Sequence, residues 1–149
     1  MAFHLNRQLC VVHVGDSRAY LYRQGRLEQL THDHTLTAEM VRSGALAPED
    51  AAHHRLRHVI TNVVGGNEVG ITVQSLSLEL QAGDRLLLSS DGLTEMVSSE
   101  SIVATLQAEP DPELAATRLL AQANDAGGKD NITVVIGVFE DSRAAAQLQ

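Results

Sequence analysis

The sequence has few aromatic and few basic residues. Its 149 residues include no Trp, two Phe and two Tyr, so the core that its 44% hydrophobic residues build must be aliphatic. Acidic residues outnumber Lys and Arg by 19 to 11, and the net charge of −8 argues against nonspecific nucleic-acid binding and against a polybasic membrane module. No run approaches the roughly 20 apolar residues of a membrane-spanning helix, and the first residues lack the apolar centre of a signal peptide. We therefore expect no nucleic-acid partner and no membrane partner.

The sequence has a single cysteine, Cys10, which cannot form an internal disulfide bond. It lies in an apolar stretch typical of a strand, and this predicts a buried thiol in a reducing compartment. The protein is accordingly expected to be cytoplasmic. The length fits one compact domain, and we find no internal repeat, low-complexity stretch or linker.

Hydrophobic periodicity and turn residues predict the secondary structure. Apolar runs indicate strands, and apolar residues at helical spacing behind capping residues indicate helices. The expected strands cover residues 9–14, 19–23, 26–30, 71–80, 85–89 and 131–139, and the expected helices cover residues 35–42, 48–52, a segment after Ser98 and a segment from Asp111 to about residue 124. The first three strands are expected to form an antiparallel meander. This order of elements indicates an α+β fold.

Two carboxylates stand at the ends of predicted strands. Asp91, followed by Gly92, comes after the apolar run 85–89, and Asp130 leads with Asn131 into the last strand. Taken alone, each would be an ordinary turn residue. Two carboxylates brought side by side would repel each other unless a divalent cation lay between them, so the pair favours a Mg²⁺ or Mn²⁺ site.

Other polar residues fit structural roles. Asp16 is expected to bond the backbone of its own turn, with Arg18 as its ion-pair partner. Asp33 and His34 precede a helix, where capping and turn chemistry is the simpler interpretation. Asp84 lies in a turn at the opposite end of its strand from the candidate ligand, so we do not expect it to bind metal.

Five short motifs occur in one order along the chain. They are Gly15-Asp16-Ser17-Arg18-Ala19-Tyr20, Leu30-Thr31-His32-Asp33-His34, Ile60-Thr61-Asn62-Val63-Val64-Gly65-Gly66, Ser90-Asp91-Gly92-Leu93-Thr94 and Asp130-Asn131-Ile132-Thr133-Val134-Val135. This ordered set strongly resembles the metal-dependent Ser/Thr protein phosphatases of type 2C, the PPM family, in their bacterial form. The resemblance runs from about residue 9 to residue 139, and five motifs in one order are far more specific than any single motif.

The resemblance implies an antiparallel β-sandwich flanked by helices, with a metal site at one end. By that resemblance Asp91 and Asp130 ligate Mn²⁺ or Mg²⁺, and Asp16 contributes to an additional, weaker site, giving two or three ions in a complete domain. Asn131 and Gly92 would support the ligands from behind. The implied reaction is hydrolysis of phosphoserine or phosphothreonine in the protein substrates of Ser/Thr kinases. A metal-activated water is the nucleophile, so no catalytic side chain is expected.

The chain departs from the family pattern at its beginning. Family members carry an Asp-Gly-Met-Gly-Gly-type segment upstream of the first motif, and this sequence has none. We therefore interpret residues 1–140 as a partial phosphatase domain whose N-terminal part is missing, and residues 141–149 as a polar tail. Whether the chain is a fragment or a truncated protein stays open. Loss of a bridging carboxylate predicts that this chain alone is weakly active or inactive.

A basic segment, residues 53–58, follows a region that the resemblance identifies as a flap beside the site, residues 35–54. In one interpretation His54, Arg55 and Arg57 attract a phosphorylated substrate. In the other, the segment is an ordinary solvated surface. The residue spacing fits no familiar zinc site.

Two functions from other classes remain open. A noncatalytic interaction module would bind a partner, or a second copy of the chain, through an uncovered sheet edge. A regulator of sigma-factor pathways built on the same phosphatase fold is the third alternative.

Overall fold

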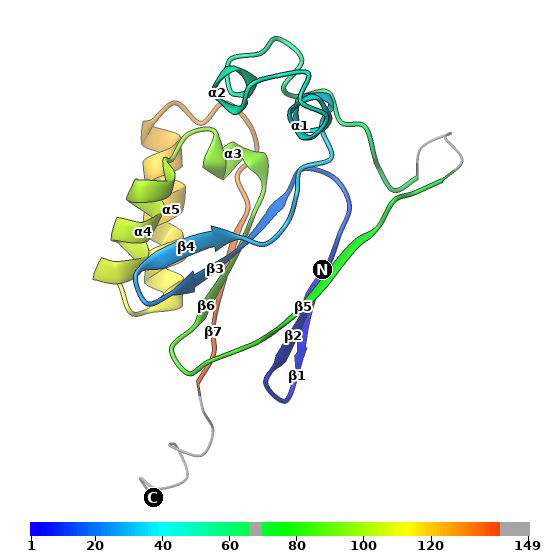
Figure 1. The fold of residues 1–149 in the computed structure, drawn as a ribbon. Helices are drawn as coiled ribbons and strands as arrows, with labels where there is room; N and C mark the ends of the chain where they lie inside the picture. Colours follow the sequence, from blue (N-terminus) through cyan, green and yellow to red (C-terminus); the bar gives the residue numbers. More distant parts are fainter. Residues whose placement is uncertain (66–69, 141–149) are drawn as a thin grey trace, which may run out of the picture.

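The computed structural model describes residues 1–65 and 70–140, in which two antiparallel sheets pack face to face (Figure 1). The three-stranded sheet has the order β1-β2-β5, and the four-stranded sheet has the order β4-β3-β6-β7. The strands are β1 (Ala2–Leu5), β2 (Gln8–His13), β3 (Arg18–Arg23), β4 (Arg26–Gln29), β5 (Gln74–Glu79), β6 (Arg85–Ser89) and β7 (Val134–Val138), and the helices are α1 (Leu36–Arg42), α2 (Pro48–Ala51), α3 (Asp91–Thr94), α4 (Ser99–Ala108) and α5 (Pro112–Asp125). The predicted α+β sandwich is confirmed. Gly66 of the third motif and the predicted tail, residues 141–149, lie outside the described residues.

Strands β3 and β6 are covered on both faces because they lie between the two hydrophobic cores of the fold. Ala19 and Leu21 of β3 point into a core between the two sheets, whereas Tyr20 points into a second core beneath α4 and α5. Leu87 of β6 belongs to the second core and is fully buried. Burial on both faces explains why these strands are continuous apolar runs in the sequence. Both cores are largely aliphatic, as the composition predicts.

The starts of three helices follow from their capping residues. The Thr35 hydroxyl accepts a hydrogen bond from the backbone N–H of Ala38 in α1, and Ser98 caps α4 in the same way. The Asp111 carboxylate accepts bonds from two backbone N–H groups of α5, and Pro112 occupies the first turn. These side chains satisfy N–H groups that have no partner within the helix, so the predicted starts are confirmed.

Only half of the meander predicted for residues 9–14, 19–23 and 26–30 is confirmed: β3 pairs antiparallel with β4, but β2 does not pair with β3. Strand β2 pairs with β1 and β5, whereas β3 pairs with β4 and β6, so these consecutive strands belong to different sheets. Gly15, with a φ of 107°, lies in the crossing between them. Val11 of β2 and Ala19 of β3 are buried in the same inter-sheet core, which a flat hairpin would not form. The crossing therefore carries the Gly-Asp-Ser-Arg motif over the end of the sandwich.

Some strand limits also differ from the expectation. Strand β1 was not predicted, and it pairs with β2 through a tight turn in which Asn6 has a φ of 56°. The expected strand 71–80 begins only at Gln74, because that is where pairing with β2 begins. The expected strand 131–139 shortens to β7, which pairs with β6 over residues 134–138. The pairing partner, which the sequence pattern does not reveal, sets these limits.

Cys10 and Asp84 test two further predictions made from the sequence. Cys10 is only half buried, with its sulfur 3.9 Å from the hydroxyl oxygen of Ser77, so the prediction of a buried thiol is wrong. It lies between Leu9 and Val11, whose side chains point to the opposite face of β2 and into the core. Asp84 is buried at the far end of β6 from the candidate site.

None of the helices in residues 1–65 and 70–140 is long and apolar enough to cross a membrane.

Candidate metal centre

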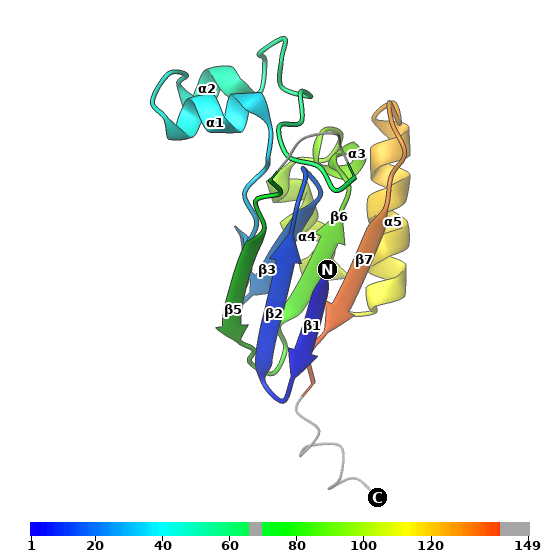
Figure 2. The ribbon, with the colours of Figure 1, turned by 90° about the vertical axis from the view of Figure 1, so that its right-hand side faces the viewer.

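The candidate site lies at the end of the sandwich where β6 runs into α3, with α1 and α2 beside it (Figures 1 and 2). A cavity of about 700 Å³ opens there. Four acidic side chains line it, those of Asp16, Asp33, Asp91 and Glu95. Their elements are distant in sequence, because Asp16 belongs to the β2–β3 crossing and Asp91 begins α3. The strand-end position that the sequence predicts for Asp91 is confirmed.

Asp16 and Asp91 lie close enough to interact through their charges. Burial, and after it the negative charge of Asp91, raises the pKa of Asp16. Within the described residues no ion pair joins a basic side chain to either carboxylate. The two groups therefore form a negative pair without a direct ion-pair partner among the described residues, and a hard divalent cation would stabilise such a pair.

Arg18 does not pair with Asp16, so that prediction is wrong. Its guanidinium instead donates from Nε to Oδ1 of Asp33 at 3.0 Å and from Nη2 to Oδ2 at 2.6 Å. These two hydrogen bonds, together with the charge of Asp33, raise the pKa of Arg18 although burial opposes the shift. Arg18 is thus engaged in a direct ion pair with Asp33 rather than with Asp16.

His34 holds the turn that presents Asp16. Its Nδ1 accepts a hydrogen bond from the backbone N–H of Gly15 at 3.1 Å, and its own backbone N–H donates to the Gly15 carbonyl at 2.9 Å. Burial, and then the neighbouring His13 ring, lowers the pKa of His34, which keeps the ring neutral and able to accept. Asp33 and His34 therefore have structural roles, as expected, although Thr35 rather than either of them caps α1.

The loop that carries Asp130 lies against the start of α3. The Ser90 hydroxyl donates to the Asn131 carbonyl at 3.1 Å and accepts from the Thr133 backbone N–H at 3.0 Å. The Asp130 carboxylate accepts from the backbone N–H of Asn131 at 2.6 Å, and the side chain of Lys129, rather than that of Asp130, lines the cavity. The structure thus places the Asp91 and Asp130 segments side by side, with the Asp130 carboxylate turned toward its own loop.

Gly92 permits this close approach. A Cβ atom at this position would lie 2.5 Å from the carbonyl oxygen of Asn131, which is far inside contact distance. We expect Gly92→Ala to force the 130–132 loop away from α3 and to lower the free energy of unfolding by about 1–3 kcal/mol. Chemical denaturation measures the loss. The matched control is Gly137→Ala, because nothing lies within 4 Å of a Cβ there. An equal loss of unfolding free energy in Gly92→Ala and Gly137→Ala would contradict a requirement for glycine at position 92.

The basic segment reaches the cavity with some of its side chains. His53, Arg57 and His58 line it, whereas the predicted His54 and Arg55 are not among its lining residues. The Nδ1 of His54 instead accepts a hydrogen bond from the backbone N–H of Leu56 within the segment. Arg57 is therefore the one residue of the predicted trio that faces the carboxylates.

Three residues of the site were missed in the sequence. Glu95 follows Asp91 by one helical turn, and this spacing was the signal that could have identified it. Lys129 directly precedes Asp130, and its place in the cavity depends on the path of the loop. His58 forms an ion pair with Glu95, with 3.0 Å between Nδ1 and Oε1, across segments that no sequence spacing connects.

The donor set fits a divalent cation. Carboxylate oxygens are the ligands that Mg²⁺ and Mn²⁺ prefer, and Asp16 and Asp91 offer them from one cavity wall. The negative charge that raises the pKa of Asp16 is the observation that favours a cation there.

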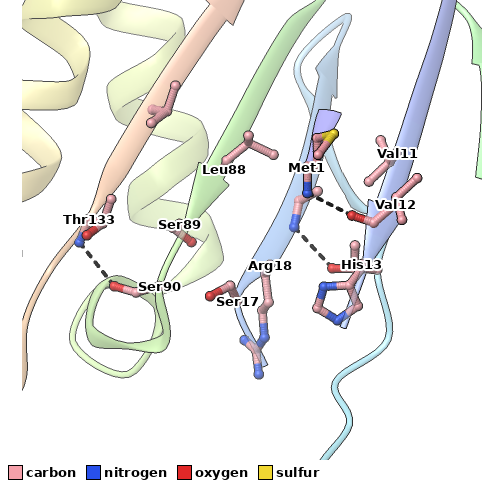
Figure 3. A pocket seen from close by; sticks show the side chains of 13 residues that line it. Met1, Val11, Val12, His13, Ser17, Arg18, Leu88, Ser89, Ser90 and Thr133 are labelled. Atoms are coloured by element: carbon pink, nitrogen blue, oxygen red, sulfur yellow. Dashed lines mark hydrogen bonds between the residues drawn. The ribbon is translucent and has the colours of Figure 1, made fainter. Parts of the chain in front are cut away.

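A second cavity, of about 300 Å³, lies between the two sheets (Figure 3). Its lining residues come from β2, β3, β6 and the start of β7, with Met1 beside them. Nε2 of His13 and Oγ of Ser89 are buried against it, and neither has a hydrogen-bond partner among residues 1–65 and 70–140. Buried polar atoms without partners are costly, so this cavity suits an occupant that supplies hydrogen bonds.

The chain is similar to known proteins over nearly its whole length. The family described as Protein phosphatase 2C matches residues 1–42. The serine/threonine protein phosphatase PstP of Mycobacterium tuberculosis is 44% identical over 134 residues, which are 90% of this chain and 26% of PstP. The serine/threonine phosphatase stp of Listeria welshimeri is 37% identical over 129 residues, which are 87% of this chain and 51% of that protein.

Solved structures agree in fold. The crystal structure of the M. tuberculosis phosphatase PstP/Ppp superposes with a TM-score of 0.87 and 41% identity, over 94% of this chain and 58% of that one. The catalytic domain of PstP in complex with two manganese ions superposes with a TM-score of 0.80 and 40% identity, over 94% of this chain and 57% of that one.

The two-sheet sandwich and the ordered motifs are those of the type 2C phosphatase fold. The chain belongs to the bacterial PPM, or type 2C, Ser/Thr phosphatase family, and it spans about half of the homologous domains. Its relatives in this family are Ser/Thr protein phosphatases.

Proposed function

We propose that the chain is part of a metal-dependent phosphatase that hydrolyses phosphoserine and phosphothreonine in proteins phosphorylated by Ser/Thr kinases. The observation that carries the proposal is the pair of carboxylates, Asp16 and Asp91, that line one cavity and repel each other. Manganese in a solved relative of 40% identity supports Mn²⁺ or Mg²⁺ as the ion.

The residues of the chain divide the work in this proposal. Asp91 and Asp16 hold the cation, and Asp130 joins them when its side chain turns toward the cavity. When bound, the ions neutralise charge on the phosphoryl oxygens and activate a water molecule. Arg57 and Lys129 line the same cavity and attract the phosphate dianion of the substrate. No side chain has to act as the nucleophile.

We further propose that the 149 residues alone hydrolyse phosphoproteins weakly. Each Mg²⁺ or Mn²⁺ ion takes about six ligands, whereas Asp16, Asp91 and Asp130 supply only one carboxylate each. A second ion would therefore be held loosely, and charge neutralisation in the transition state would be incomplete.

A direct test measures phosphate release from a phosphothreonine peptide with and without Mn²⁺. We expect slow release that depends on Mn²⁺ and stops when a chelator removes it. Release at the same rate in excess chelator would refute the metal-dependent mechanism. Full activity with Mn²⁺ would refute only the weak-activity proposal.

A second candidate function is a noncatalytic interaction module, and the inter-sheet cavity favours it. The outer edges of β1 and β7 have no strand partner within the described residues. Val135 of β7 is 54% exposed although it lines the cavity, and Phe3 of β1 is 50% exposed. Unpaired edges beside apolar surface promote pairing with another strand, so we propose self-association through these edges as the alternative role.

Sedimentation at several protein concentrations discriminates the two functions. Concentration-dependent dimerisation without Mn²⁺ binding favours the module. A monomer that binds Mn²⁺ favours the phosphatase. Val135→Lys places a charge beside the cavity, and it should abolish a dimer formed through β7.

A further inference from the structure

A mixed cluster of potential metal ligands lies at the start of α3. One ligand atom from each of His58, Asp91 and Glu95 lies within 4.8 Å of those of the other two. Nδ1 of His58 and Oε1 of Glu95 are 3.0 Å apart. Neighbouring ligands of an octahedral ion are separated by about 3 Å when metal–ligand bonds are about 2.1 Å, so this pair already has the spacing of two ligands of such an ion.

Independent elements position the three residues. Asp91 and Glu95 are one helical turn apart, and the Glu95 backbone N–H donates to the Asp91 carbonyl at 2.9 Å. His58 comes from the segment that follows α2. The next residue, Val59, accepts from the Leu36 backbone N–H at 2.8 Å, so the start of α1 anchors this segment. The backbone beside His58 is therefore fixed to α1, and the imidazole reaches the end of α3 through its contact with Glu95.

The surroundings of the cluster favour a cation. All three side chains line the 700 Å³ cavity, together with Asp16. Within the described residues, the ion pair of His58 with Glu95 leaves the carboxylates of Asp16 and Asp91 in the same cavity without an ion-pair partner. The cluster is therefore more than the pairing of one histidine with one glutamate.

We propose that His58, Asp91 and Glu95 form a site for a divalent transition-metal ion, with His58 as its nitrogen ligand. Imidazole suits transition ions, whereas Mg²⁺ prefers a shell made only of oxygen. The site therefore selects Mn²⁺ over Mg²⁺, and the ion ties the segment that follows α2 to α3. This inference rests on the proposed function for Asp91, and it adds two ligands and a metal preference.

The test compares the unmodified chain with His58→Ala, using Mn²⁺ and Mg²⁺ as the probes. We expect His58→Ala to weaken Mn²⁺ binding in calorimetric titrations by about 10- to 100-fold and to leave Mg²⁺ binding within about twofold. Pulsed electron paramagnetic resonance of bound Mn²⁺ should show the modulation of a directly bonded nitrogen, and His58→Ala should remove it. Far-UV circular dichroism checks that the variant is folded.

His53→Ala is the matched control, because His53 lies in the same segment and lines the same cavity but is not part of the cluster. It should retain both the affinity and the nitrogen signal. Unchanged Mn²⁺ binding in His58→Ala, with no nitrogen signal in the unmodified chain, overturns the inference. If His58→Ala has no effect but Asp91→Asn abolishes Mn²⁺ binding, the proposed phosphatase function survives without the His58 site. If the unmodified chain binds no Mn²⁺, the proposed function and the His58 site both fail.

Discussion

Asp91→Asn is expected to abolish Mn²⁺-dependent phosphate release and to weaken Mn²⁺ binding by at least about 100-fold, or about 2.7 kcal/mol. The substitution keeps the size of the side chain, replaces one acceptor oxygen by an NH₂ donor, and removes the charge that interacts with Asp16. An amide oxygen is a weaker ligand for a hard divalent ion than a carboxylate. Calorimetry and the phosphopeptide assay measure the two losses.

The same substitution should stabilise the metal-free protein. Without the negative charge of Asp91, the pKa of Asp16 moves back toward its ordinary value, because that charge is the second-largest cause of the rise. Relief of repulsion at a functional site commonly raises stability while activity falls. Thermal unfolding in chelator should therefore shift upward for Asp91→Asn. Asp125→Asn, at the exposed end of α5, is the charge-matched control. It should change neither the unfolding temperature in chelator nor the Mn²⁺-dependent phosphate release. Lower stability together with lost activity would indicate misfolding instead.

Leu87→Ala is expected to lower the free energy of unfolding by about 3–4 kcal/mol. Leu87 has no exposed surface and lies between Tyr20 and Ile136 in the registered strands of the four-stranded sheet. Its side chain fills the core beneath α4 and α5, so truncation leaves a cavity as well as lost burial. Urea denaturation should show a lower midpoint with an unchanged slope.

Leu114→Ala provides the comparison, because it makes the same chemical change at a position that is 51% exposed on α5. It should cost less than about 1 kcal/mol. Comparable losses for both variants would mean that the sheet–helix core does not dominate stability. Because Leu87 lies two residues before the end of β6, the removal of its side chain in Leu87→Ala should also make the start of α3 less rigid.

The elements that the sequence predicted well are those with local causes. Ser98 and Asp111 cap their helices through bonds that span two or three residues, and such bonds leave a clear sequence signal. The apolar run of β6 marks a strand wherever that strand lies in the fold. Asp91 was therefore placed correctly just after the end of β6.

The predictions that failed depended on partners distant in sequence. The Gly15-Asp16 turn has the local pattern of a hairpin, but β2 and β3 diverge because each finds a better partner elsewhere. Arg18 has Asp16 two residues away and still pairs with Asp33, because the sheet crossing turns its guanidinium toward Asp33. Local spacing does not contain that information.

The sequence by itself determined the family, the strand and helix types, the aliphatic core and the candidate ligands, because each of these depends on residue identity and short-range order. Only the tertiary structure decided that Asp16 and Asp91 share a cavity, that His58 and Glu95 join them, and that Asp130 turns toward its own loop. The physical reason is that the interactions between charged side chains at this site depend on distances in space, and packing of the two sheets sets those distances.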